Sequence, residues 1–180
     1  NGEPKTYTQP FEFKEGGEIK AWIADNNSFA TSMTFDRITT IPIKIAFCSS
    51  EENKAEDTPA TNLIDANLNT FWHTMYSVTM ANYPHWVDFD CYETKTLTGF
   101  CYTPRQDSHN GNIKDYEIYV SQDGKNWGEP ILKQSFANNT NAKKVMFEKP
   151  VKARYLRFKA LSSQDKQDFA SGAEFTIMAE

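Results

Sequence analysis

The sequence lacks the features that mark membrane-spanning, nucleic-acid-binding and disulfide-rich proteins. No apolar run reaches the roughly 18 residues that a transmembrane helix needs, so we expect no membrane insertion. With 19 Lys and Arg against 24 Asp and Glu, the formal net charge is −5. This balance argues against nucleic acid or an anionic bilayer as partner, because both select a concentrated basic face. With three cysteines, one cannot form a disulfide within the chain, so the sequence does not indicate a disulfide framework.

The signatures of common enzymes are also missing. The sequence has no Gly-x-Ser-x-Gly elbow, no Cys/His nucleophile arrangement, no His-Glu-x-x-His motif and no phosphate-binding loop. Glycoside hydrolysis needs two carboxylates flanking one bond, and the available Glu56 and Glu174 lie far apart in the sequence. We therefore expect no catalytic activity. The chain begins at Asn1 without an initiator Met or a signal peptide, which suggests a piece of a longer protein.

Strand patterns recur where helical periodicity is scarce. Apolar and polar residues alternate at 87–91, 116–120, 145–147, 154–159 and 175–177. Such period-two runs are typical of sheets with one buried face. The pair Asp123-Gly124, directly after one run, predicts a tight turn. The spacing leaves no room for the crossover helices of a parallel sheet, so we predict an all-β, antiparallel β-sandwich of jelly-roll type.

The first 36 residues follow another pattern. Phe11 and Phe13 on one side, and 19–23 on the other, suggest two strands around the turn Glu15-Gly16-Gly17. This segment is too short to bury a core of its own, so it must pack on the larger domain or belong to a neighbour. Residues 37–46 read as a stretched connector, because a residue before proline is held extended. We predict two parts, 1–36 and 37–180.

Oxygen-bearing side chains crowd one short segment. Asp65, Asn67 and Thr70 offer oxygen ligands at intervals of two and three, and Glu174 could complete the shell from just before the final strand. Hard cations such as Ca²⁺ prefer six to eight oxygens. The alternative is a turn rich in Asp and Asn without an ion, because the twelve-residue helix-loop-helix calcium pattern is absent.

Motifs spread over residues 37–180 resemble the discoidin domain. This family is also called the coagulation factor 5/8 type C domain, and in bacterial enzymes it appears as carbohydrate-binding module family 32. The matching segments are 62–73, 83–86, 99–100, 104–107, 116–127, 151–162 and 173–175. Residues 1–21 are similar to the small β repeat that follows the catalytic domains of chitobiases and related hexosaminidases. A neighbouring repeat accompanies bacterial α-L-fucosidases.

The resemblance implies a discoidin-type jelly roll with a sugar site on its loops. Galactose-binding members have a His after the Trp, and then an Arg and an Asn five residues apart. Sugar hydroxyls need such directional donors and acceptors, and an aromatic ring can cover the C–H face. Glu56 lies at the position where those members carry an acidic partner, and Tyr76 and Phe169 lie where they carry stacking rings. The implied site residues are His73, Arg105, Asn110, Glu56, Tyr76 and Phe169.

The resemblance also implies one structural Ca²⁺. Its ligands would be Asp65, Thr70 and Glu174, with backbone oxygens near Asn62 and Asn67. The sequence departs from the family at Ala66, where the family usually has Gly. A calcium loop that required a positive φ at this position would be strained, because alanine carries a Cβ.

The expected function is that of a noncatalytic carbohydrate-binding module, which holds a parent glycoside hydrolase near terminal galactose or N-acetylgalactosamine. The resemblance implies a bacterial chitobiase/β-hexosaminidase or α-L-fucosidase as the parent catalytic domain in the same chain, and a periplasmic, cell-surface or secreted location. The alternative is a discoidin module for protein or cell-surface adhesion without sugar binding. Lipid-binding members expose apolar spikes among basic residues, whereas residues 49–57 here are polar and acidic.

Overall fold

The computed structural model describes residues 3–11, 16–23, 26–35, 39–80 and 82–180. Its internal contacts divide the chain into two compact units, Asn1–Thr39 and Thr40–Glu180. The sequence placed this boundary three residues earlier, after residue 36. Among the described residues, no helix has the length and apolarity to cross a bilayer.

The first unit contains a β-hairpin that pairs differently from the prediction. Strand β1 (Gly17–Ile23) pairs antiparallel with β2 (Asn26–Phe35). The predicted strand at 19–23 is confirmed, but its partner follows it in the sequence. Residues 7–11 form no strand, and the predicted Phe13 and Glu15 lie outside the described residues. The signal for β2 was weak because its small polar residues blur the alternation, whereas pairing across a short connection costs little loop entropy.

The second unit is the predicted antiparallel β-sandwich. Its main sheet has the order β3-β11-β6-β9-β7-β8, with β4 beside β6. These strands are β3 (Thr40–Ile41), β4 (Lys44–Cys48), β6 (His85–Thr103), β7 (Asp115–Ser121), β8 (Leu132–Ser135), β9 (Lys143–Ala160) and β11 (Glu174–Ala179). The 3-10 turn η1 (Ala60–Ile64) and a small pair of strands, β5 (Trp72–His73) and β10 (Ser171–Gly172), complete it. Part of the predicted connector, 40–41 and 44–46, belongs to the sheet.

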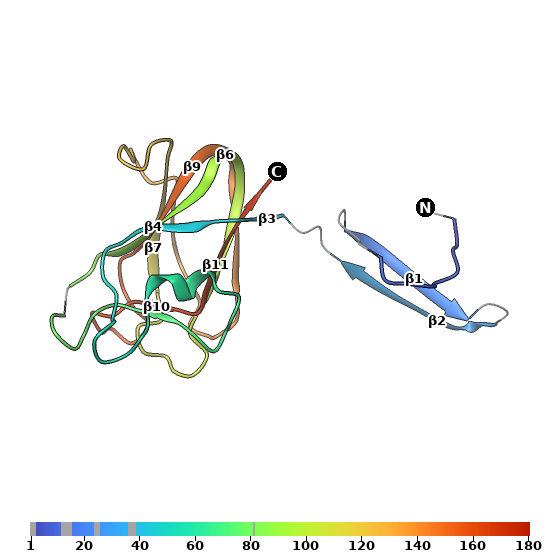
Figure 1. Cartoon of the computed structure of the whole chain (residues 1–180), viewed down its shortest axis with the longest axis horizontal. Helices are drawn as coiled ribbons and strands as arrows, with labels where there is room; N and C mark the ends of the chain where they lie inside the picture. Colours follow the sequence, from blue (N-terminus) through green and yellow to red (C-terminus); the bar gives the residue numbers. More distant parts are fainter. Residues whose placement is uncertain (1–2, 12–15, 24–25, 36–38, 81) are drawn as a thin grey trace. The chain divides into compact units, whose positions relative to one another are not determined.

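One sheet forms two layers because β6 and β9 are long enough to serve both (Figure 1). Residues 85–90 of β6 pair with 155–160 of β9, and β4, β7 and β8 extend this first layer. After register breaks, residues 95–102 of β6 pair with 143–153 of β9, and β11 and β3 extend the second layer. At Gly99 the two strands come so close that a Cβ would lie 2.3 Å from the Val145 carbonyl oxygen, which only glycine avoids.

An aromatic core joins the two layers. Phe175 of β11 stacks on Phe89 of the first layer with ring centroids 4.4 Å apart, and on Phe100 at 5.2 Å. Phe158 lies 5.1 Å from the same ring. All four side chains are at most 2% exposed. Close-packed aromatic rings of this kind supply much of the apolar burial of a sandwich.

The three cysteines are free thiols: Cys91 is buried, and Cys48 and Cys101 are half-buried. Burial raises the pKa of Cys48 to about 12 and that of Cys91 to about 11, so these thiols stay protonated at neutral pH.

Truncating the central ring should strongly destabilise the sandwich. We expect Phe175→Ala to lower the free energy of unfolding by about 3–5 kcal/mol, because it removes a buried ring and leaves a cavity. Denaturant unfolding monitored by fluorescence measures the change. Val78→Ala is the control, since Val78 is 69% exposed and should change stability by no more than about 0.5 kcal/mol. Equal effects of the two substitutions would contradict the proposed core.

Candidate functional site

His73 lies at the base of the candidate site. It ends β5, which pairs with β10 through Ser171, and its side chain is 1% exposed. Nδ1 lies 2.7 Å from the Thr74 carbonyl oxygen, which can only accept, so Nδ1 carries the proton. Burial lowers the pKa of His73, and the nearby Arg105 acts in the same direction. In the neutral ring, Nε2 is therefore an acceptor.

Two rings and an amide surround His73. The Tyr76 and Phe169 ring centroids each lie 5.3 Å from the imidazole centroid and 6.1 Å from each other. Asn110 Nδ2 lies 3.5 Å from His73 Nε2. Asn110 is exposed, whereas Phe169 is half-buried. The structure thus brings together four of the predicted residues, from the end of β5 and from three loops.

Arg105 is held more firmly than a loop residue usually is. Its Nε and Nη2 donate to Asp107 Oδ1 and Oδ2 at 2.8 and 2.7 Å. Its guanidinium carbon lies 3.6 Å from the centroid of the Phe71 ring, and the residue is only 8% exposed. Two of five N–H donors are therefore used internally, and three remain for a ligand. The pairing holds the pKa of Asp107 below its usual range.

Glu56 belongs to the same neighbourhood. Burial first, and then the charge of Glu56, raise the pKa of Tyr76. Glu56 also acts on His73, where its charge opposes the effect of burial. All six predicted sugar-site residues thus gather at one end of the second unit, with Glu56 as the exposed acidic member.

The sequence analysis missed the residue that ties these loops together. Glu52 is fully buried, and its carboxylate accepts hydrogen bonds from the backbone N–H groups of Lys54, Ala55, Tyr76 and Ser77 at 2.8–3.1 Å. Its own backbone N–H donates to the His73 carbonyl oxygen at 2.8 Å. These bonds hold the pKa of Glu52 far below its usual range against the effect of burial. No local sequence signal reveals this role, since the partners are up to 25 residues away.

Asp107 and Phe71 were also missed as supports of Arg105. The spacing of Arg105 and Asp107 could have suggested their pairing, because side chains two residues apart on an extended segment share one side. The contact with Phe71 joins residues 34 positions apart and had no sequence signal.

A second cluster contains the predicted calcium ligands. Thr70 Oγ1 lies 2.7 Å from Asp65 Oδ2 and 2.8 Å from the Asn67 carbonyl oxygen. The Asn67 backbone N–H donates to Asp65 Oδ1 and to Glu174 Oε1, both at 2.9 Å. Asn62 donates from Nδ2 to the Phe71 carbonyl oxygen at 3.0 Å. The loop thus places carboxylate, hydroxyl and carbonyl oxygens together, which is the donor set of a hard cation.

The conformation of this loop shows how alanine is accommodated at position 66, where the discoidin family usually has glycine. Ala66 adopts a φ of +61°, the left-handed conformation that glycine adopts without cost. The alanine is thus accommodated with local strain. Burial raises the pKa of Glu174 to about 7, and the neighbouring Asp65 acts in the same direction. Among the described residues, the hydrogen-bond partners of these two carboxyl groups are N–H and O–H donors, a setting in which a cation would be favourable.

A β-sandwich with polar and aromatic side chains gathered on the loops at one end defines the class of this protein. The chain belongs to the F5/8 type C domain family, whose profile matches residues 45–175. It is 36% identical over 172 residues to a sialidase from Micromonospora viridifaciens, covering 94% of this chain and 26% of the sialidase. It is also 36% identical over 133 residues to galactose oxidase from Gibberella zeae, covering 72% of this chain and 19% of that enzyme. The chain thus spans about a quarter or less of these relatives.

Solved structures of family 32 carbohydrate-binding modules share the fold. The Clostridium perfringens module CpGH89CBM32-5, in complex with GalNAc-β-1,3-galactose, superposes with a TM-score of 0.71 at 29% identity, covering 78% of this chain and 99% of that one. The module of C. perfringens NanJ, in complex with galactose, gives 0.68 at 27% identity, covering 77% and 97%. The C-terminal domain of a Bacteroides fragilis chitobiase gives 0.68 at 26% identity, covering 81% and 98%. The predicted discoidin-type fold is confirmed.

Removing the charge of Glu52 should loosen the loops that carry Tyr76 and Glu56. We expect Glu52→Gln to lower the unfolding midpoint at neutral pH and to speed amide exchange at Tyr76 and Ser77, because the new NH₂ group faces N–H donors. The depressed pKa means that this stabilisation is complete above the unfolded-state pKa of glutamate and is lost as pH falls towards the folded-state value. The exposed Glu148→Gln is the control. Unchanged exchange at both amides would contradict the role of Glu52.

Proposed function

We propose that this chain is a carbohydrate-binding module whose loop site takes a terminal galactose or N-acetylgalactosamine. The observation that supports this most is the cluster of His73, Arg105, Asn110 and two rings at one end of the sandwich. His73 Nε2 offers an acceptor, Arg105 three donors, and Asn110 both. The Phe169 or Tyr76 ring can cover the C–H face that the axial O4 of galactose leaves free. Two solved relatives hold galactose or a GalNAc-galactose disaccharide.

The module is noncatalytic and serves a larger enzyme. Its two candidate acids work in different places: Glu56 lies beside Tyr76, whereas Glu174 contacts Asn67 in the oxygen-rich loop. They do not face one bond as a glycosidase pair must. The parent is a glycoside hydrolase, with a chitobiase/β-hexosaminidase or α-L-fucosidase as our proposal, acting outside the bacterial cytoplasm at the cell surface, in the periplasm or after secretion. One monosaccharide offers few contacts, so we expect a Kd of roughly 0.1–1 mM, improved by multivalency.

One Ca²⁺ stabilises the loop at residues 62–70. Asp65, Thr70 and Glu174 would hold it with the backbone oxygens of Asn62 and Asn67, and it would supply positive charge between the two carboxylates. Thr70 Oγ1, Asp65 Oδ2 and the Asn67 carbonyl oxygen lie close together and share the single proton of the Thr70 hydroxyl. Lone pairs of these oxygens therefore remain free for an ion.

Sugar binding should depend on Asn110 and on galacto configuration. We expect Asn110→Ala to weaken galactose binding about three- to tenfold, because a neutral hydrogen bond is lost from an exposed residue that leaves the fold intact. Arg105→Ala should cost about tenfold or more, with a lower melting point, since Arg105 is buried against Phe71. Titration calorimetry with galactose, N-acetylgalactosamine and glucose measures these effects.

The exposed Asn138→Ala is the matched control and should bind normally. Equal affinity for glucose and galactose would overturn the proposed specificity. Normal binding by both site variants would show that the sugar binds elsewhere, and no binding of any sugar by the wild type would favour the adhesion alternative.

Calcium should raise the thermal stability of the chain. An ion that binds only the native state stabilises by mass action, about 2.7 kcal/mol at a hundredfold excess over Kd. We expect a higher melting midpoint in excess Ca²⁺ than in excess EDTA, and we expect Asp65→Asn to abolish the difference. Asp57→Asn, an exposed acidic residue outside the cluster, is the control. Identical midpoints for the wild type under both conditions would remove the calcium site.

A further inference from the structure

The outward face of the first layer carries a hollow that shares none of the six loop-site residues. It has a volume of about 350 Å³ and is lined by Pro84, Trp86, Tyr119, Arg157 and Lys159. We call it the outer groove. Its size falls within the range of small-ligand sites in proteins. Every lining residue except Pro84 lies on β6, β7 or β9.

The strand register gives the outer groove aromatic sides and a basic floor. β9 lies between β6 and β7, with Trp86 opposite Lys159 on one side and Tyr119 opposite Arg157 on the other. The two aromatic residues are therefore two strand spacings apart across the sheet, roughly 9–10 Å, and are offset by two residues along the strands. The Lys159 Nζ lies 5.3 Å from the Tyr119 ring centroid, and the Arg157 guanidinium carbon lies 5.3 Å from that of Trp86. Flat rings beside fixed donors are what a sugar with a charged substituent needs.

The basic groups of the floor keep donors free. Arg157 Nε and Nη2 donate to Asp88 at 2.6 and 2.8 Å, so three of its five N–H groups remain. Glu117 already accepts from Tyr119 Oη at 2.6 Å and pairs with Lys133 at 2.9 Å. Lys159 Nζ donates to Glu117 Oε2 at 3.3 Å and to Tyr119 Oη at 3.4 Å, so one of its three N–H groups remains. Because Lys133 and Lys159 share the single carboxylate of Glu117, this cluster keeps a net positive charge.

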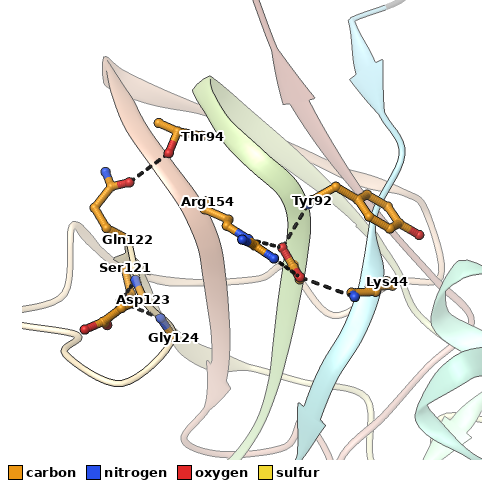
Figure 2. A network of polar contacts seen from close by, with 9 residues as sticks. Lys44, Tyr92, Thr94, Ser121, Gln122, Asp123, Gly124 and Arg154 are labelled. Carbon is orange, nitrogen blue, oxygen red and sulfur yellow. Dashed lines mark hydrogen bonds and ion pairs between the residues drawn. The ribbon is translucent and has the colours of Figure 1, made fainter.

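Ion pairs extend this basic character along the face. Arg154 and Lys44 converge on Asp90 at 2.8 and 3.5 Å, and Figure 2 shows both side chains pointing to the same carboxylate. The linked pairs of this face contain five basic and three acidic side chains, on a chain with a formal net charge of −5. The acidic side chains are 4–9% exposed and the basic ones 23–66%. The cations therefore lie above the carboxylates, and the face presents positive charge to solvent.

We propose that the outer groove binds a linear oligosaccharide containing uronic acid. One sugar ring would pack on Trp86 or Tyr119, and its carboxylate would face Arg157 and Lys159. A linear acidic chain fits better than a single terminal acidic sugar, because Arg154, Arg157 and Lys159 follow one strand over roughly 17 Å. Repeated carboxylates can meet cations arranged in a row. This site is independent of the galactose site on the loops and takes a different class of sugar.

The test uses the whole 180-residue chain and a probe that the loop site should not take. A hyaluronan tetrasaccharide alternates glucuronic acid with N-acetylglucosamine and has no galacto-configured ring. Its carboxyl methyl ester has the same shape without the charge. Calorimetry should show the acid form binding about fivefold or more tightly than the ester, and more weakly as salt rises. Tryptophan fluorescence is a second readout, because Trp86 lines the groove and the Trp127 ring centroid lies 4.3 Å from the Arg157 guanidinium carbon.

Matched variants locate the site. Lys159→Met keeps the aliphatic stem and should lose about fivefold or more of the affinity for the acid form. Lys152→Met removes the same charge from an exposed position on β9 outside the groove, and should change it by less than about twofold. Asn110→Ala should weaken galactose binding about three- to tenfold while the tetrasaccharide binds normally.

Several outcomes would overturn the proposal: no binding of the acid form, equal binding of acid and ester, or equal losses in Lys159→Met and Lys152→Met. Loss of tetrasaccharide binding in Asn110→Ala would place the ligand in the loop site instead. Failure of galactose binding alone would overturn the proposed function and leave the outer groove in place.

Discussion

The ladder between β6 and β9 is the constraint on which the rest of the second unit depends. These two strands pair in both layers, so their register breaks and the close approach at Gly99 decide how the sheet folds over itself. The ladder also decides where the site residues leave the sheet. Arg105 follows the end of β6 by two residues, and Phe169 lies between the end of β9 and β10. The loop site is therefore a consequence of where two bent strands end.

Carboxylates organise the polar parts of the second unit in three different ways, and in two of them the carboxylates are buried. Glu52 accepts backbone N–H groups and fixes two loops, whereas Asp88 and Asp90 accept Arg157 and Arg154 on the sheet. In each case the donors compensate for the loss of water around the charge. The described partners of Asp65 and Glu174 are instead N–H groups and a hydroxyl. This contrast separates the proposed cation site from the structural carboxylates.

The loop site and the outer groove differ in the chemistry that they offer. The loop site combines a neutral imidazole, an amide and the free donors of one guanidinium, which suits the hydroxyl groups of an uncharged sugar. The groove combines cations with rings on a flat sheet, which suits a carboxylated chain. A module with both sites would hold its parent enzyme on a mixed glycan through two weak contacts, whose combined strength exceeds either one alone.

Much of this protein could be read from the sequence. Alternation at 87–91, 116–120, 154–159 and 175–177 identified strands of the sandwich, because a half-buried strand must repeat its apolar residues with period two. The resemblance to discoidin domains named the six predicted sugar-site residues, which lie together in the structure, and the spacing of Asp65, Asn67 and Thr70 indicated the oxygen-rich loop. The first hairpin was misread, because its polar second strand carries a weak alternation signal.

The tertiary structure alone decided how those residues are supported and which charges remain free. Glu52 and Phe71 act on partners more than 20 residues away, and such contacts leave no trace in local spacing. On β9, the ion pairs of Arg157 and Lys159 have buried carboxylates and more exposed cations, because cross-strand register, rather than composition, sets which side chain lies on top.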